Sequence, residues 1–333
     1  MAMLSLFSFM NKNLYREAFA HSWRLATKHI WLWPFGLFAA LLGQLGVTEL
    51  LSALGVIKDQ YGAATSVQLI LEIFRGFNFS NFSNLNFLQW GGAVWILFIW
   101  ILLAIVLTFI AISSQGALIH AASKPSHRIK AFHPASSSWH VGVRHFWRLF
   151  ALTIVKKAGL LLLGLLVAWV SYRSSTTGSL LDQSIFVITF LVALFVGLSL
   201  SFYTIYAACY VIVEEYDDKQ ALQAAWSLLK DHPIVSIEVA LILLVLNIGM
   251  ALFSILSFFL FLVPAGVVWI LGAVISSQLV LSIAIIVGLL SFVIFVMFIG
   301  AMFTIYSTST WTYLFMKMHK NGVKSHVMHM LGK

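Results

Sequence analysis

Long apolar stretches alternate with short amphipathic ones along this chain, and the alternation recurs three times. In each amphipathic stretch apolar side chains recur three and four positions apart, with charged and polar side chains between them, which predicts a helix in the plane of a membrane surface. Each stretch also holds a Trp with a His six positions later: Trp23 and His29, Trp139 and His145, Trp226 and His232.

The apolar stretches are long enough to cross a bilayer as helices, because about 20 apolar residues span a ~30 Å hydrocarbon core. Pro264 and Gly266 predict a turn between the last two, and the last helix can continue past Trp311 toward Lys317. We therefore predict an all-α polytopic membrane protein with six transmembrane helices in three pseudo-repeats, each led by an amphipathic interfacial helix. The predicted spans are at about 31–54, 92–118, 149–172, 184–213, 234–262 and 276–310.

The repeat divides the chain into a leader with the first interfacial helix, a six-span helical bundle and a basic tail. No cleavable signal peptide is expected, since polar residues rather than a cleavage site follow the first ten. The polar connection 77–87 alternates aromatic side chains with Asn and Ser, which is compatible with a strand or an irregular interfacial loop. The divisions are 1–30, 31–316 with repeats at about 11–122, 126–214 and 215–316, and 317–333.

Composition supports the membrane class. Apolar residues make up 61% of the chain and charged residues 9%, whereas soluble domains carry about 25% charged residues. A single cysteine, Cys209, excludes a disulfide framework and a Cys-based metal site. The sequence has no nucleotide-binding, hydrolase or zinc motif. We therefore expect no catalytic activity, no cofactor and no metal.

The distribution of charge predicts the topology. The formal net charge is +9, and seventeen of the twenty Lys and Arg lie on the side that holds both termini, the exceptions being Lys58, Arg75 and Arg173. The positive-inside rule then predicts cytoplasmic N- and C-termini in a bacterial inner membrane, with all three interfacial helices on the cytoplasmic face. Anionic lipid headgroups, rather than nucleic acid, account for the positive charge.

Basic and aromatic side chains of the interfacial helices are the candidate lipid- or partner-binding residues. The second of these helices carries a basic stripe that continues into the third span, at Arg144, Arg148, Lys156 and Lys157. The three Trp residues suit the depth at which Trp is enriched: Trp23, Trp139 and Trp226.

Lys156 is a candidate intramembrane charge. It lies roughly 9 Å inward if the third span begins near Phe150. Such charges are costly and usually have a partner, and Glu238 in the fifth span is the candidate for an ion pair. In the alternative interpretation the interfacial helix runs longer and both lysines reach the surface.

Polar residues recur in the inner halves of the even-numbered spans. Ser113, Gln115, Tyr206 and Tyr306 either form helix-to-helix hydrogen bonds or line a pocket open to the cytoplasm. Further along, the acidic segment 214–218 is interpreted either as a solvated turn with an N-cap or as a cation site.

The segment 211–230 has an acidic turn, then Ala221-Leu222 and Trp226, then Lys230 before a new apolar stretch. This pattern resembles the membrane domain attached to some bacterial glycerophosphoryl diester phosphodiesterases, and related uncharacterised six-span bacterial membrane proteins. Weaker versions occur at Ser22-Trp23 and Ser138-Trp139. The resemblance covers about 10–316 and implies an inner-membrane module of accessory function. The catalytic domain of that family is not found in this sequence, so no phosphodiesterase activity is implied.

The function expected first is an integral membrane module that binds anionic lipid or a membrane protein partner through its basic interfacial helices. The alternative is a transporter or channel subunit with a cytoplasm-facing polar pocket. A third class, an intramembrane enzyme acting on lipid, lacks the motifs that such chemistry needs.

Overall fold

The computed structural model describes residues 14–40, 42, 87–124, 134–177, 179–275 and 278–321. Within these ranges all regular structure is helical, and five helices are long and apolar enough to cross a membrane. The predicted all-α class and multi-pass membrane character are therefore confirmed. The helices are α2 (Leu14–Lys28), η2 (Ile30–Leu32), α3 (Trp33–Ala40), α7 (Phe87–Ser123), α8 (Pro134–Arg144), α9 (Phe146–Thr177), α10 (Leu180–Val213), α11 (Asp218–Asp231), α12 (Pro233–Val274) and α13 (Gln278–Asn321).

The candidate spans lie in α7, α9, α10, α12 and α13. η2 and α3 form a shorter apolar helix over Ile30–Ala40, at the start of the first predicted span. Apart from Leu42, the rest of that span lies outside the described residues, as does the alternating pattern at 77–86.

The turn predicted at Pro264 and Gly266 is wrong. α12 runs through both residues to Val274, and the chain turns between Val274 and Gln278 instead. In an apolar medium a turn leaves several backbone groups without partners, whereas a proline inside a helix frees only one carbonyl, so the helix continues. At the other end, α13 extends past Trp311 and Lys317 to Asn321, which confirms that the last helix continues as predicted.

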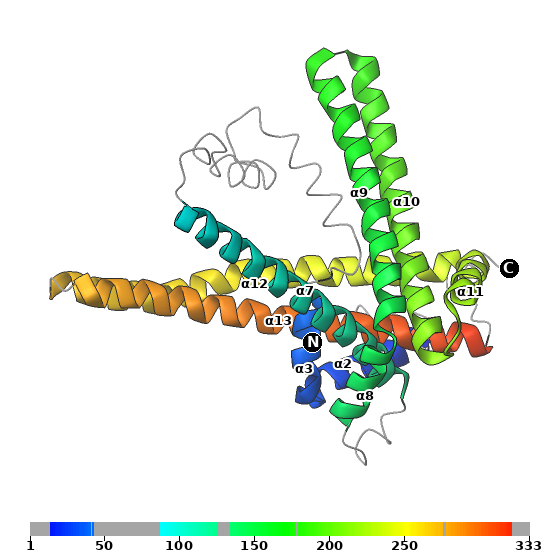
Figure 1. Cartoon of the computed structure of the whole chain (residues 1–333), viewed down its shortest axis with the longest axis horizontal. Coiled ribbons are helices and arrows are strands. Elements are labelled where there is room, and N and C mark those ends of the chain that lie inside the picture. Colours follow the sequence, from blue (N-terminus) through cyan, green and yellow to red (C-terminus); the bar gives the residue numbers. More distant parts are fainter. Residues whose placement is uncertain are drawn as a thin grey trace.

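The long helices meet at one end in a packed hub, formed by the inner halves of α7, α9, α10, α12 and α13 with the short helices α2, α3, α8 and α11. From this hub α9 and α10 leave as one hairpin and α12 and α13 as another, in different directions (Figure 1). The three largest fully buried side chains, Trp311, Tyr206 and Phe315, lie in the hub. The distal halves of the hairpins expose apolar side chains instead, which is typical of a lipid-facing surface.

The short helices pack on the long ones in a cyclic order. α8 packs on α7, the long helix before it, and α11 packs on α10 in the same way. The first short helix, α2, packs on α13, the last long helix. Since α7, α10 and α13 also contact one another, the order of packing closes into a ring around these three helices.

The residue before each Trp of the amphipathic stretches explains how the short helices pack. Ser22, Ser138 and Ala225 are all buried, because a small side chain lets the helix backbone approach its neighbour closely. The Trp that follows points outward, so that Trp23 and Trp226 remain half exposed. The three histidines at the sixth position mark the junctions with the next helix: His29, His145 and His232.

Candidate functional site

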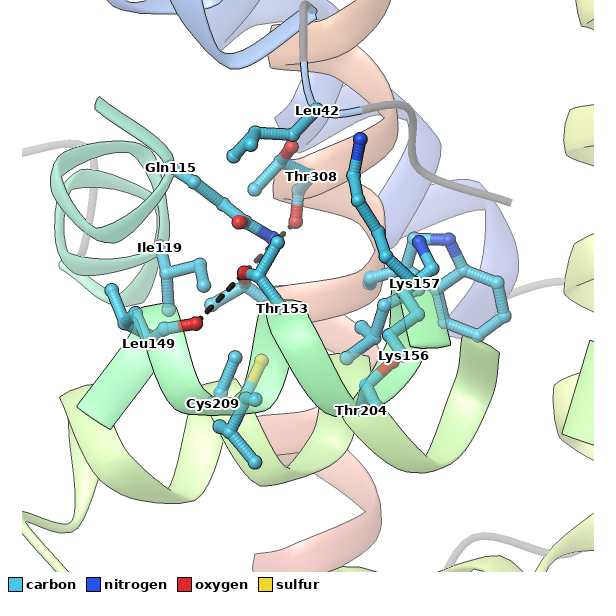
Figure 2. A pocket seen from close by; sticks show the side chains of 15 residues that line it. Leu42, Gln115, Ile119, Leu149, Thr153, Lys156, Lys157, Thr204, Cys209 and Thr308 are labelled. Carbon is cyan, nitrogen blue, oxygen red and sulfur yellow. Dashed lines mark hydrogen bonds between the residues drawn. The ribbon is translucent and has the colours of Figure 1, made fainter. Parts of the chain in front are cut away.

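A small cavity lies in the hub where α7, α9, α10 and α13 meet. Its volume is about 40 Å³, which holds about three water molecules, since each needs roughly 10–15 Å³ on this measure. Figure 2 shows Gln115 of α7 pointing across toward Thr308 of α13. The polar side chains of the lining come from all four helices: Gln115, Thr153, Lys156, Lys157, Thr204, Cys209, Thr308, Trp311 and Thr312.

A larger apolar groove of about 400 Å³ adjoins the cavity between α7 and α9. Leu42, Thr153 and Lys157 line both spaces, so the groove and the cavity share a wall. The remaining lining of the groove is almost entirely apolar: Leu107, Thr108, Ala111, Ile112, Phe150, Ile154, Ala158 and Leu161.

The two lysines of α9 occupy different environments at this wall. Lys156 is only 9% exposed, whereas Lys157 is exposed and extends toward Leu42 (Figure 2). α8 ends at Arg144, and α9 starts at Phe146 after His145, whose Nδ1 lies 3.0 Å from the Val141 carbonyl oxygen. Ten residues of helix, about 15 Å, therefore separate the start of α9 from Lys156.

The cavity lies at a common depth along its four helices. Each of the four helices contributes a lining residue that lies about 18 to 24 residues from the distal end of its apolar segment, the end that points away from the hub. These residues are Gln115, Lys156, Thr204 and Thr308. At 1.5 Å per residue this distance is roughly 27–36 Å. A hydrocarbon core of ~30 Å that begins at those ends would therefore end close to the cavity.

Hydrogen bonds inside the helices define which atoms of the lining remain available. Thr153 donates its hydroxyl hydrogen to the Leu149 carbonyl (2.7 Å), and Thr204 donates to the Leu200 and Ser201 carbonyls (both 3.0 Å). Each hydroxyl oxygen thus keeps lone pairs but has no hydrogen to offer. Trp311 is 2% exposed, and within the described part of the chain its Nε1 has no hydrogen-bond partner.

Of the predicted pocket residues, Gln115 lines the cavity and the other three lie elsewhere in the hub. Tyr206 bonds Ser236 of α12 through its hydroxyl, with 2.7 Å between the oxygens. Tyr306 packs against the rings of Phe19 and Trp23 on α2, at centroid distances of 6.2 and 6.4 Å.

Ser113 is buried on α7 at the crossing with α8. Its hydroxyl and those of Ser114, Ser307 and Ser309 have no hydrogen-bond partner among the described residues.

Sequence reasoning missed Thr153 and Trp311. Thr153 lies three positions before Lys156 on the same helix, so helical spacing could have identified it. Trp311 is one of twelve tryptophans, and its place at the cavity follows from the packing of α13 against α10.

Arg148 contacts the acidic turn between α10 and α11. Its guanidinium donates to the Tyr216 carbonyl (3.2 Å) and to an Asp217 carboxylate oxygen (3.1 Å), and it lies 3.7 Å from Asp218. Glu215 in this turn has a positive φ of 56°. Asp217 stands at the N-cap position of α11 without a side-chain capping bond, so Arg148 supplies the counter-charge for this turn.

The other predicted binding residues lie on the outside of the hub. Arg144 is exposed at the end of α8, and Trp139 stacks on Phe35 of α3 with centroids 5.8 Å apart. Glu238 is half-buried on α12, and its pairing with Lys156 stays a prediction. In the described ranges no three His, Cys, Asp or Glu side chains come together as a metal site would require.

No family model, no curated protein and no solved structure matches this chain. The resemblance to the phosphodiesterase-associated membrane domain therefore rests on the residue pattern of 211–230 and its weaker copies, and function has to be argued from the site.

Proposed function

We propose that the chain is an integral membrane module, without catalytic activity of its own, that binds an anionic phospholipid between α7 and α9. The observation that carries this proposal is the pair Lys156 and Lys157 beside the boundary between a small polar cavity and an apolar groove. A phospholipid has the same division, with a charged headgroup joined to apolar chains. The phosphate would lie near the lysines and part of an acyl chain in the groove.

The depth of the site supports this proposal. The cavity lies where a ~30 Å hydrocarbon core counted from the distal ends of the helices would end, and lipid headgroups occupy that level. An acyl chain gains little by moving from other lipid tails into a protein groove, because both are apolar. The lysines and their hydrogen bonds therefore supply the preference for anionic lipid, at about 1 kcal/mol per basic residue.

The same proposal includes the finer architecture. The cyclic packing of α2, α8 and α11 on α13, α7 and α10 is the order that three successive units of one design would produce. With the excess of Lys and Arg near the hub, it supports six spans in three pseudo-repeats in a bacterial inner membrane, the hub and both termini facing the cytoplasm.

Lipid that stays bound through purification tests the proposal. Mass spectrometry of extracted lipid would compare the wild-type protein with Lys157→Met and with Lys230→Met, a control at an exposed position of α11 that lines neither space. We expect the ratio of anionic to zwitterionic lipid to fall about fivefold in Lys157→Met, the equivalent of about 1 kcal/mol, and to be unchanged in Lys230→Met.

A further variant separates the cavity from the outer surface. Arg144→Gln removes a basic group of α8 that does not line either space. If this variant lost the anionic lipid while Lys157→Met retained it, binding would belong to the interfacial helix, and the site between α7 and α9 would be refuted.

The second candidate is a transporter or channel subunit with a polar pocket open to the cytoplasm. It is favoured by the four buried serine hydroxyls of α7 and α13 that have no partner among the described residues, because buried hydroxyls normally have one or contact water. Ser113→Cys and Ser309→Cys in a Cys209→Ser background would test it. Reaction with a small water-soluble thiol reagent supports a hydrated path, and complete protection contradicts it.

A further inference from the structure

Four of the polar side chains that line the cavity divide into hydrogen-bond donors and acceptors, whereas the amide of Gln115 offers both. The hydroxyls of Thr153 and Thr204 have given their hydrogens to carbonyls of their own helices, so toward the cavity they act as acceptors. The ammonium of Lys156 is a donor only, and so is the indole N–H of Trp311, which has no partner within the described ranges. A ligand that satisfies this lining carries both acceptor and donor groups.

The two kinds of lining atom point to two parts of one headgroup. A phosphodiester offers oxygens that only accept, which suits Lys156 and Trp311. A hydroxyl farther along the headgroup can donate, which suits Thr153 and Thr204. A phosphate offers no donor to the remaining lone pairs of the threonine oxygens, whereas a headgroup hydroxyl does.

We infer that the site selects an anionic phospholipid whose phosphodiester bears a small hydroxylated headgroup, with Trp311 donating to the phosphate and Thr153 and Thr204 accepting from the headgroup hydroxyls. This inference rests on the proposed function, because it specifies the lipid bound at the same site. It assigns Trp311, which stands among serines and threonines in the sequence, a role in specificity that the sequence pattern did not indicate.

Size and charge narrow the class of headgroup. A cavity for about three waters has room for roughly 90 Å³ of ligand, at ~30 Å³ per water. A three-carbon polyol fits this space, whereas a sugar ring with its hydroxyls does not. Cationic headgroups such as ethanolamine and choline are disfavoured beside two lysines.

Native mass spectrometry of the full-length protein in nanodiscs provides the test. The probes are phosphatidylglycerol and phosphatidylethanol, which carry the same single negative charge but differ in the headgroup hydroxyls, with phosphatidylcholine as the zwitterionic reference. We expect the wild-type protein to retain phosphatidylglycerol about tenfold better than phosphatidylethanol, and both better than phosphatidylcholine.

Two variants test the two halves of the site separately. Trp311→Phe keeps an aromatic ring but removes the N–H, so retention of both anionic lipids should fall about fivefold. Thr153→Val with Thr204→Val should remove the preference for phosphatidylglycerol while phosphatidylethanol is retained as before. Trp269→Phe and Thr176→Val, at exposed positions near the distal ends of α12 and α9, are the matched controls and should behave as wild type.

The outcomes distinguish the inference from the proposed function. If the wild-type protein retains the two anionic lipids equally, the hydroxylated headgroup is refuted, and this result needs no variant to fold. Trp311→Phe with wild-type retention would refute the role of the indole. Equal retention of all three lipids would refute the proposed function itself. Displacement of phosphatidylglycerol by millimolar glycerol phosphate would show that the ligand is a soluble phosphate ester and overturn the lipid assignment.

Discussion

His21 is a titratable side chain held in the packed part of the hub. Its ring lies 5.2 Å from that of Tyr313 on α13, and its Nε2 is buried without a partner among the described residues. Burial lowers the pKa of His21 below its ordinary value of 6.5, and the nearby charges of Arg24 and His29 lower it further, while a hydrogen bond to the Ala122 backbone opposes them. The neutral imidazole is therefore the form that fits between α2, α7 and α13.

This lowered pKa predicts that stability falls on acidification. The unfolded chain binds a proton at His21 near pH 6.5, whereas the folded protein binds it only at lower pH. The contribution of neutral His21 to stability is therefore complete above pH 6.5 and is lost as the pH falls through the lowered pKa. One such group changes the free energy of unfolding by at most about 1.4 kcal/mol per pH unit.

Thermal unfolding between pH 7.5 and 5 measures this effect. His21→Gln should show a weaker loss of stability on acidification than the wild-type protein, and His140→Gln, at an exposed position on α8, should match the wild type. Identical pH profiles for wild type and His21→Gln would contradict the assignment.

Single residues of the cavity were predictable from the sequence where a charged or amide side chain stood in an apolar stretch, as Lys156 and Gln115 do. Tyr206 and Tyr306 recur at matching positions in the sequence, yet one bonds α12 and the other packs on α2. Their different surroundings follow from the neighbours that each helix meets, which helical periodicity does not specify.

At the scale of elements, the backbones of α7 and α8 approach each other closely where the two helices cross. A Cβ placed on Gly142 would overlap the Ser113 carbonyl oxygen and lie 3.0 Å from the Ala117 nitrogen. Gly116 faces the same crossing, and a Cβ there would lie 3.0 Å from the Gly142 Cα. Glycines on facing helices let the two backbones touch, as small residues do between membrane helices.

Gly142→Ala should therefore destabilise the protein by about 2 kcal/mol or more, since overpacking a tight contact typically costs 1–3 kcal/mol and the obstructing atoms are backbone. Gly249→Ala is the matched control: among the described residues nothing lies within 4 Å of its added methyl group, and alanine favours a helix by up to about 1 kcal/mol. Unfolding in increasing denaturant, followed by tryptophan fluorescence, measures both. A Gly142→Ala protein as stable as wild type would contradict the close crossing.

The sequence predicted which long helices form more reliably than it predicted where they end. The long helices were predicted because a run of twenty or more apolar residues has few alternatives in a bilayer. Pro264 was misleading, because a proline often ends a helix in water, whereas in the apolar core of a bilayer α12 continues through it. The close packing at Gly142 could not be predicted, because the sequence of α8 does not specify which helix it packs against in the tertiary structure.

At the scale of the whole molecule, the length of the long helices separates a membrane part from the hub. α12 and α13 have 42 and 44 residues, or about 63 and 66 Å at 1.5 Å per residue. A ~30 Å hydrocarbon core needs less than half of that. The remaining length lies in the hub, where side chains are buried against the short helices, while the distal halves present apolar surface.

This division predicts where the two hairpin tips lie. Transmembrane helices tilt by at most about 40° from the bilayer normal. Both hairpins can therefore cross one bilayer only if their distal halves lie close together, with both tips on the side opposite the hub. Cysteines at Ser179 and Ile275, at the tips of the α9–α10 and α12–α13 hairpins, should then both react with a membrane-impermeant maleimide added to cells whose outer membrane has been opened. The background carries Cys209→Ser so that the inserted cysteine is the one labelled.

The hub supplies the opposite half of the same experiment. Lys230→Cys, at an exposed position of α11, should react only after the inner membrane is opened if the hub faces the cytoplasm, as we propose from the excess of Lys and Arg. If one tip is labelled from outside and the other only from inside, the two hairpins do not cross the membrane in the same direction. In that case the cavity between α7, α9, α10 and α13 would not lie at one membrane surface, and a lipid headgroup could not reach it from the bilayer.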